Sequence, residues 1–207
     1  MALRDYDDLN ALQLDALREI GNIGSGNAAS ALSSMLDRPV DIAVPKITIL
    51  DYETVVQNLG GPEQLLVGLL LSLDGDVTGM IMFLLHKEFA HMVLNTLTGS
   101  TLEENGELDE FSESAIREVG NIMAASYVNA MAELTGLSIN LSVPSLSIDM
   151  AGSILSVPAI YYANISDKII FIEDEFNQKT DHAASHILLI PEVDSLQKIM
   201  TSLGLDE

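Results

Sequence analysis

An internal duplication constrains the fold of this chain more than any other feature of its sequence. The segment LREIGNIGSGNAASAL at residues 17–32 recurs as IREVGNIMAASYVNAM at residues 116–131, a constant offset of 116 − 17 = 99 residues. The same offset pairs Val44-Pro45 with Val143-Pro144, well outside the matched segments. This spacing is much longer than the period of a solenoid repeat, so it favours one pseudo-symmetric domain built from two halves.

The length and composition agree with a single folded domain. The chain has 207 residues, enough to bury a sizeable core, and 48% of them are hydrophobic, which excludes disorder for most of the chain. We predict one domain over residues 1–207, with repeat halves at about residues 9–100 and 108–207. An acidic linker is predicted between them at residues 101–107.

Apolar periodicity predicts a similar order of elements in the two halves. Helices are predicted at about residues 9–36, 87–97, 109–134, 149–155 and 194–203. Strands are predicted at about residues 40–50, 65–73, 77–85, 139–148, 168–173 and 186–191, with a hairpin turn at Asp74-Gly75-Asp76. The expected fold class is α/β (α+β): an antiparallel or mixed β-sheet with pseudo-two-fold symmetry and its helices, including two long ones, packed on one face.

An excess of acidic residues limits the kinds of partner. Lys and Arg number 9 and Asp and Glu 31, for a net charge of −22. Nucleic acids and anionic membrane surfaces require a positive surface, so we expect neither as a partner. The N-terminus lacks the pattern of a signal peptide and no apolar run is long enough for a membrane helix, so we expect a cytoplasmic protein. The chain has no Cys, which excludes disulfides, a thiol nucleophile and cysteine-based zinc sites.

Three polar side chains lie on one face of each predicted long helix. Asp15, Glu19 and Asn22 are spaced i, i+4 and i+7, which places them within an arc of about 60°. The second half carries the same stripe as Ser114, Glu118 and Asn121. A polar stripe by itself is typical of a solvated helix face. Here, however, the Glu and the Asn recur unchanged, and Asn is unfavourable inside a helix, so the stripe indicates a functional site.

Glycines surround the stripe and leave two interpretations open. Gly21, Gly24 and Gly26 in the first helix and Gly120 in the second are each unfavourable by about 1 kcal/mol relative to Ala in an exposed helix. They indicate either the close approach of a partner's backbone to the exposed amide or tight packing of the helix on the sheet.

A Glu and an Asn without a nucleophile or a metal fit one kind of chemistry. The carboxylate can anchor a cation, and the amide can orient a water molecule through one donor and one acceptor. Neither group is a strong base. The pair therefore suits hydrolysis of an electrophile that is already activated elsewhere, in which only the attacking water must be positioned.

The duplicated pattern resembles that of the CheC/CheX/FliY family of chemotaxis phosphatases. It reads Asp15-x3-Glu19-x2-Asn22-x22-Pro45 and Ser114-x3-Glu118-x2-Asn121-x22-Pro144. The resemblance covers essentially the whole chain, including the turn at Asp74-Gly75-Asp76. Two complete motifs in 207 residues are similar to the two-site members, with no room expected for an added motor-switch module.

The resemblance implies a two-component signalling phosphatase that hydrolyses the aspartyl phosphate of the response regulator CheY-P. Asn22 and Asn121 would orient the attacking water, and Glu19 and Glu118 would pair with the active-site Lys of the receiver. Asp15 and Ser114 would contact the docking edge of the receiver. The family pattern implies no cofactor or metal bound by this chain, with Mg²⁺ supplied by the receiver domain.

The resemblance also implies a second partner, the receptor deamidase CheD. Asp149 and Met150 would lie in the docking helix after Pro144, although Asp149 could instead be an ordinary N-cap. The chain would be a monomer or a heterodimer with CheD. The alternative function is a non-catalytic adaptor that binds CheD and regulates receptor adaptation. A metal site at His182 and His186 is disfavoured, because side chains four residues apart do not converge on a strand.

Overall fold

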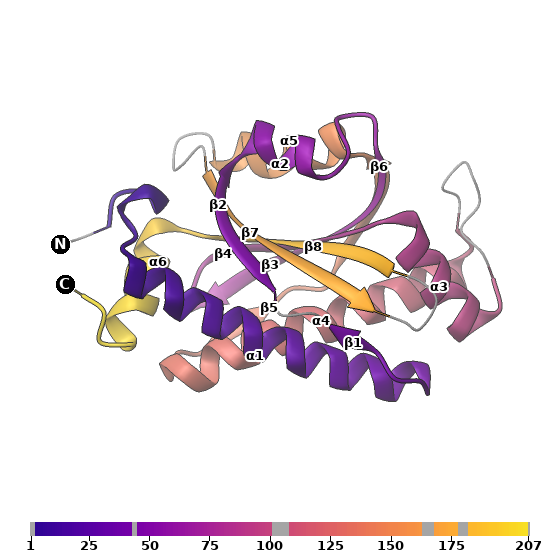
Figure 1. Cartoon of the computed structure of the whole chain (residues 1–207), viewed down its shortest axis with the longest axis horizontal. Helices are drawn as coiled ribbons and strands as arrows, with labels where there is room; N and C mark the ends of the chain where they lie inside the picture. The colour runs from indigo at the N-terminus through magenta and orange to yellow at the C-terminus, as the bar shows by residue number, and fades with distance from the viewer. Residues whose placement is uncertain (1–2, 43–44, 101–107, 163–167, 178–181, 207) are drawn as a thin grey trace.

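The computed structural model describes residues 3–42, 45–100, 108–162, 168–177 and 182–206, which form an α+β domain around one antiparallel sheet (Figure 1). The strands described are β1 Asp41–Ile42, β2 Lys46–Asp51, β3 Leu65–Gly75, β4 Gly79–Leu85, β5 Ile139–Leu141, β6 Ser145–Met150, β7 Lys168–Asn177 and β8 His182–Pro191. The helices described are η1 Tyr6–Asp8, α1 Ala11–Leu36, α2 Tyr52–Asn58, α3 Lys87–Thr98, α4 Glu110–Thr135, α5 Ala151–Tyr162 and α6 Val193–Ser202.

The two halves of the sequence exchange their edge strands. β1 and β2, from the first half, both pair with β7 of the second half. In the same way β5 and β6, from the second half, both pair with β3 of the first half. The hairpins β3–β4 and β7–β8 join through β4 and β8 in the centre. The duplicated sequence therefore folds around one continuous sheet.

Helices cover both faces of this sheet (Figure 1). The long helices α1 and α4 lie side by side on one face, where their apolar residues join those of α3 and α6 in the larger core. The short helices α2 and α5 cover part of the other face with a smaller core. Successive strand residues belong to different cores: Ile170 and Ile172 face α1 and α4, whereas Ile169 and Phe171 face the other side of the sheet. The prediction of helices on one face is thus right for the long helices and wrong for α2 and α5.

Both predicted strands that contain an internal proline are interrupted. The predicted strand at residues 139–148 is β5 and β6, and Ser142 to Pro144 lie outside both, because proline cannot donate a hydrogen bond to a neighbouring strand. The predicted strand at residues 40–50 is likewise β1 and β2. The hairpin β3–β4 and helices α1, α3, α4 and α6 match the predictions to within a few residues. The predicted linker at residues 101–107 lies outside the described residues.

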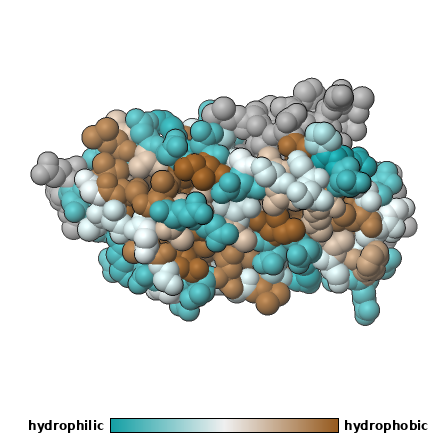
Figure 2. Space-filling model, turned by 90° about the horizontal axis from the view of Figure 1, so that it is seen from below, coloured by the Kyte–Doolittle hydropathy of each residue, from teal (hydrophilic) through white to brown (hydrophobic). Residues whose placement is uncertain are grey.

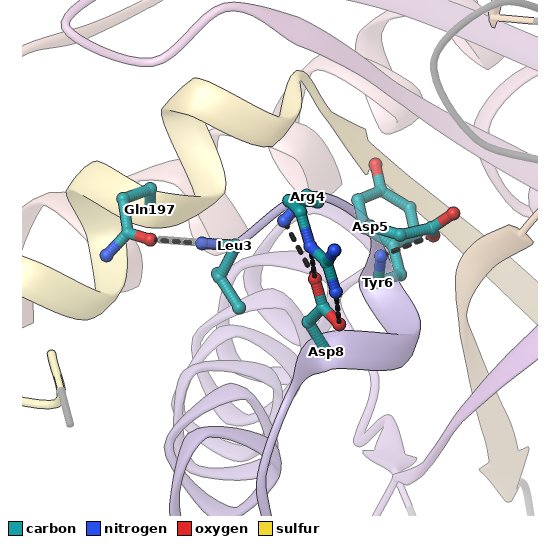
Figure 3. A network of polar contacts seen from close by, with 6 residues as sticks. All are labelled: Leu3, Arg4, Asp5, Tyr6, Asp8 and Gln197. Atoms are coloured by element: carbon teal, nitrogen blue, oxygen red, sulfur yellow. Dashed lines mark hydrogen bonds and ion pairs between the residues drawn. The ribbon is translucent and has the colours of Figure 1, made fainter. Parts of the chain in front are cut away.

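The N-terminal segment holds the start of α1 in place (Figure 3). The backbone N–H of Leu3 donates to Gln197 of α6 at 2.7 Å, and Arg4 pairs with Asp8 at 3.3 Å. The hydroxyl of the buried Tyr6 donates to the carbonyl of Pro191 at 2.5 Å. A capping box between Asn10 and Gln13 then begins α1.

Candidate functional site

The two polar stripes lie on the exposed faces of α1 and α4. All six side chains are exposed to solvent: Asp15, Glu19, Asn22, Ser114, Glu118 and Asn121. Within the described residues, neither Glu takes part in a salt bridge and neither Asn side chain is hydrogen-bonded. Both pairs therefore present their polar atoms to a partner without first having to break an internal contact.

Close packing beneath the stripes explains the glycine before each Asn. A Cβ atom on Gly21 would lie 2.5 Å from Cδ1 of Ile47, and one on Gly120 would lie 2.6 Å from Cδ1 of Leu69. Both distances are too short for real carbon contacts. The glycines therefore let the helices approach the sheet, so the packing interpretation holds for Gly21 and Gly120.

A similar contact joins the two long helices. A Cβ on Gly24 would lie 2.7 Å from Cδ1 of Tyr127 and 3.1 Å from its Cα, and the hydroxyls of Ser25 and Tyr127 are 2.5 Å apart. The Tyr127 ring also packs edge-on against Phe83, with ring centroids 6.2 Å apart. Gly24 thus allows α1 and α4 to pack closely. Both stripes lie on this pair of packed helices.

Gly26 differs from the other glycines of the stripe. It is exposed, and a Cβ there would meet nothing within 4 Å. Internal packing does not explain it, so the approach of a partner's backbone stays a prediction for this position. The second half carries Ala125 at the equivalent position, which shows that a methyl group is compatible with that half of the fold.

The two stripes are associated with opposite edges of the sheet. Helix α1 contacts β1 and β2 at one edge, and α4 contacts β5 and β6 at the other. In the second half, Ser114, Glu118 and Asn121 line a shallow depression of about 380 Å³ together with residues 141–144. The depression brings the motif proline, Pro144, beside the Glu and the Asn that precede it by more than 20 residues.

The arginine of each motif has a different partner. Arg18 pairs with Asp15 on the same exposed helix face. Arg117 instead donates to the carbonyl of Pro144 at 2.6 Å and lies 3.6 Å from Glu113, so it ties α4 to the loop between β5 and β6. The hydroxyl of Ser114 donates to the carbonyl of Glu110 at 2.8 Å. The first positions of the two motifs therefore differ in charge and in contacts.

The structure corrects the placement of Asp149 and Met150. Both were predicted to lie in a helix, but they are the last residues of β6, paired with Leu66 and Leu65 of β3, and α5 begins only at Ala151. The carboxylate of Asp149 accepts from the backbone N–H of Met150 at 2.7 Å, which is not the N-cap geometry of α5. The cross-strand hydrogen bonds extend β6 beyond the end that the local sequence indicates.

An exposed apolar surface follows these two residues. Val157, Ile160 and Tyr161 of α5 are more than half exposed, and Met150 is 48% exposed. Beside them, a depression of about 330 Å³ is lined by Asp149, Val157 and residues of β3, β4 and β6. The α5 residues and this depression belong to the face of the sheet opposite α1 and α4, and no sequence pattern indicated the α5 residues.

Two histidines meet on that same face, away from both stripes. Nε2 of His86 lies 3.2 Å from Nε2 of the buried His186, whose ring stacks on Phe171. Burial and the neighbouring His86 lower the pKa of His186 to about 4, although Glu173 opposes the shift. The side chain of His182 lies outside the described residues. Within the part that is described, no three His, Asp or Glu side chains are arranged to hold a metal ion.

The lowered pKa of His186 predicts a loss of stability in mild acid. The unfolded chain binds a proton near the ordinary pKa of 6.5, whereas the folded chain resists protonation down to about 4. The contribution of neutral His186 to the free energy of unfolding is therefore present above pH 6.5 and is lost as the pH drops toward 4. The loss should be about 2 kcal/mol between pH 7 and pH 5. Urea unfolding at pH 5, 6 and 7 measures this. His186→Leu should reduce the dependence of the unfolding free energy on pH, and the control variant His91→Gln should retain the wild-type dependence. The same pH dependence in all three proteins would contradict the assignment to His186.

No helix among the described residues is both long enough and apolar enough to cross a lipid bilayer.

Fold and site together define a duplicated α+β domain that displays a Glu/Asn pair on each of two long helices. The model of the CheC-like family matches residues 12–49 and 111–148, which are the two motif segments. The CheY-P phosphatase CheC of Bacillus subtilis is 33% identical over 204 residues, covering 96% of this chain and 97% of that protein. The chain belongs to the CheC-like family.

Two further relatives extend the comparison. The flagellar motor switch phosphatase FliY of Bacillus subtilis is 26% identical over 145 residues, covering 70% of this chain and 38% of FliY. The crystal structure of Thermotoga maritima FliY superposes with a TM-score of 0.74 at 23% identity, covering 97% of this chain and 100% of that one. The latter likeness establishes the fold.

Proposed function

We propose that this chain is a protein phosphatase that accelerates hydrolysis of the aspartyl phosphate of CheY-P. The observation that carries this proposal is the pair of exposed Glu/Asn motifs, each on a helix that glycine packing holds firmly against the rest of the fold. A catalyst that only positions a water molecule needs such rigidity, because a misplacement of about 1 Å can reduce the rate about 100-fold. Membership of a family that contains a CheY-P phosphatase supports the same substrate.

Each Asn would act directly on the reacting atoms. The amide of Asn22 or Asn121 enters the receiver's active site and holds a water molecule in line with the phosphorus–oxygen bond that breaks. The water oxygen bonds to phosphorus while the aspartate carboxylate leaves, so the products are inorganic phosphate and the free receiver. The chain supplies no cofactor in this scheme; Mg²⁺ would be held by the receiver and would neutralise charge on the phosphoryl oxygens.

Each Glu would fix the orientation of the receiver. Glu19 and Glu118 carry exposed carboxylates that can accept hydrogen bonds from a Lys on the receiver. Asp15 and Ser114, one turn earlier on the same face, would contact the edge of the docked receiver. The two stripes are associated with opposite edges of the sheet, so each would form a docking site of its own.

The direct test is the decay of phosphorylated CheY with and without the purified chain. Catalytic amounts of the chain should shorten the lifetime of CheY-P in the presence of Mg²⁺. An unchanged lifetime at every concentration of the chain would reject the proposal.

We infer a second function, binding of the deamidase CheD, from the α5 surface. Exposed Val157 lines one depression with the acidic Asp149, and Ile160 lies one turn further along α5, a mixture of apolar and charged groups that suits a protein partner. This surface and the two stripes belong to opposite faces of the sheet, so CheD and CheY-P can bind together. The chain would then be an adaptor as well as a phosphatase, alone or as a heterodimer with CheD.

Reversal of the charge at Asp149 tests the CheD surface. Asp149→Lys should weaken CheD binding by at least about tenfold, because like charges that are brought together at an interface are unfavourable. Titration calorimetry with purified CheD measures the affinity. Glu133→Lys on α4 is the matched control, an exposed acid on the other face that should leave binding unchanged. Equal affinities of the two variants for CheD would show that Asp149 is not part of the interface.

A further inference from the structure

Each polar stripe begins with an exposed apolar side chain that the motif does not include. Leu12 on α1 is 67% exposed and Phe111 on α4 is 66% exposed, and they are among the few large apolar side chains left exposed in the described residues. Their numbers differ by 111 − 12 = 99, the offset of the duplication, so they occupy equivalent positions in the two halves. The surface that α1 and α4 form carries apolar patches between hydrophilic ones (Figure 2).

The flanking positions make this coincidence informative. The residues on either side differ between the halves: Ala11 corresponds to Glu110, and Gln13 corresponds to Ser112. The position between them is large and apolar in both halves although it is exposed in both. A single exposed apolar side chain is ordinary on a protein surface, but its recurrence at the equivalent position of both halves, at the start of both stripes, points to a use at the surface.

Helix geometry places these residues in line with the motif. Leu12 precedes Asp15, Glu19 and Asn22 by three, seven and ten residues, so all four lie within an arc of about 80°. The ten-residue separation from Asn22 corresponds to about 15 Å along the helix axis. Phe111 has the same relation to Asn121. Each stripe is thus a continuous strip with an apolar end, a charged centre and an amide at the far end.

We propose that Leu12 and Phe111 are apolar anchors for the phosphorylated receiver at the two sites. Each packs against an apolar patch on the receiver surface about 15 Å from the aspartyl phosphate, while the Asn of the same strip reaches the phosphate. This inference rests on the proposed phosphatase function, because continuity with the Glu/Asn strip is what identifies the occupant. An exposed aromatic or aliphatic side chain that becomes buried at the centre of an interface is a common source of affinity.

The position of the anchors dictates their kinetic effect. They lie far from the reacting atoms, so their contacts are the same in the bound ground state and in the transition state. Such uniform binding lowers KM and leaves kcat unchanged. Phe111 is larger than Leu12 and buries more apolar area, so the anchor on α4 should contribute more.

The test compares Leu12→Ser/Phe111→Ser with the wild type and with Leu134→Ser, an exposed apolar residue near the other end of α4. Binding of BeF₃⁻-activated CheY is measured by fluorescence anisotropy, and CheY-P hydrolysis by the rate of phosphate release. The double variant should bind about tenfold more weakly or worse, with a matching rise in KM and an unchanged kcat. Leu134→Ser should bind and hydrolyse as the wild type does, and circular dichroism should show that all three proteins are folded.

The outcomes separate the two proposals. A wild type that binds and hydrolyses, with a double variant equal to it, overturns the anchors and leaves the phosphatase intact. Loss of kcat without loss of affinity also overturns them. If the double variant only dissociates a dimer of this chain in light scattering, the occupant is a second copy and the proposal is wrong. A wild type that neither binds activated CheY nor hydrolyses CheY-P overturns the proposed function and the anchors with it.

Discussion

A chain that carries Asn22→Ala and Asn121→Ala together is expected to lose nearly all acceleration of CheY-P hydrolysis while it folds as the wild type does. Groups that position a water molecule or stabilise developing charge are typically worth about 100- to 1000-fold in rate. Both side chains are exposed and have no internal hydrogen bond in the described part of the chain, so their removal opens no cavity. Ala also has a better helix propensity than Asn, so stability should rise slightly if it changes.

The measurement is the rate of phosphate release from CheY-P under single-turnover conditions, with each single variant beside the double. Each single variant isolates one site, and the two residual rates give the relative activities of α1 and α4. Asn129→Ala is the matched control, because Asn129 is an exposed Asn on α4 that lies outside the motif, eight residues beyond Asn121. A double variant with wild-type acceleration would reject the role of the two amides, and with it the mechanism.

Gly24→Leu is expected to lower the free energy of unfolding by at least about 3 kcal/mol. A single Cβ at this position already lies 2.7 Å from the Tyr127 ring and 3.1 Å from its backbone Cα, and backbone cannot move aside as a flexible side chain can. Overpacking of a filled core typically costs about 1–3 kcal/mol, and a Leu adds three more carbon atoms beyond the Cβ. Tyr127 is also hydrogen-bonded to Ser25, so the substitution should disrupt this hydrogen bond as well and separate α1 from α4.

Gly26→Leu provides the control within the same helix. Nothing lies within 4 Å of a Cβ at Gly26, so the better helix propensity of Leu should stabilise the chain by up to about 1 kcal/mol. Urea unfolding of the two variants and the wild type at pH 7 measures the difference. The two substitutions, only two residues apart, are expected to change the free energy of unfolding in opposite directions. A Gly24→Leu chain as stable as the wild type would show that α1 and α4 do not pack as described.

Local patterns in the sequence were enough to predict several elements and the residues of the stripes. Helices α1 and α4 follow from their apolar periodicity, and their glycine C-cap or proline stop signals mark the ends within a residue or two. The exposure of Glu19, Asn22, Glu118 and Asn121 follows from the same periodicity. The resemblance to the CheC/CheX/FliY family rested on the spacing of these residues, and membership of the CheC-like family confirms it.

Other predictions from local sequence were wrong or incomplete, chiefly because the structure there depends on contacts between distant parts of the chain. Asp149 and Met150 were predicted in a helix, but pairing with Leu66 and Leu65 keeps them in β6. Helix α2 was not predicted, since seven residues carry too short a periodic pattern, although the Asp51 side chain that caps Thr54 is a local signal of its start. For Gly24, the sequence supported two interpretations equally, and only the position of Tyr127 distinguished them.

Residue spacing alone predicts that the chain is duplicated, that each half carries a long helix, and which side chains share its exposed face. These properties depend on the helical repeat of 3.6 residues and on internal identities, both of which are local. The exchange of edge strands between the halves, and the association of the two stripes with opposite edges of one sheet, are evident only from the three-dimensional fold. The partners of these edge strands lie far away in the sequence, and their register is set by backbone hydrogen bonds and by burial on both faces, which no local pattern encodes.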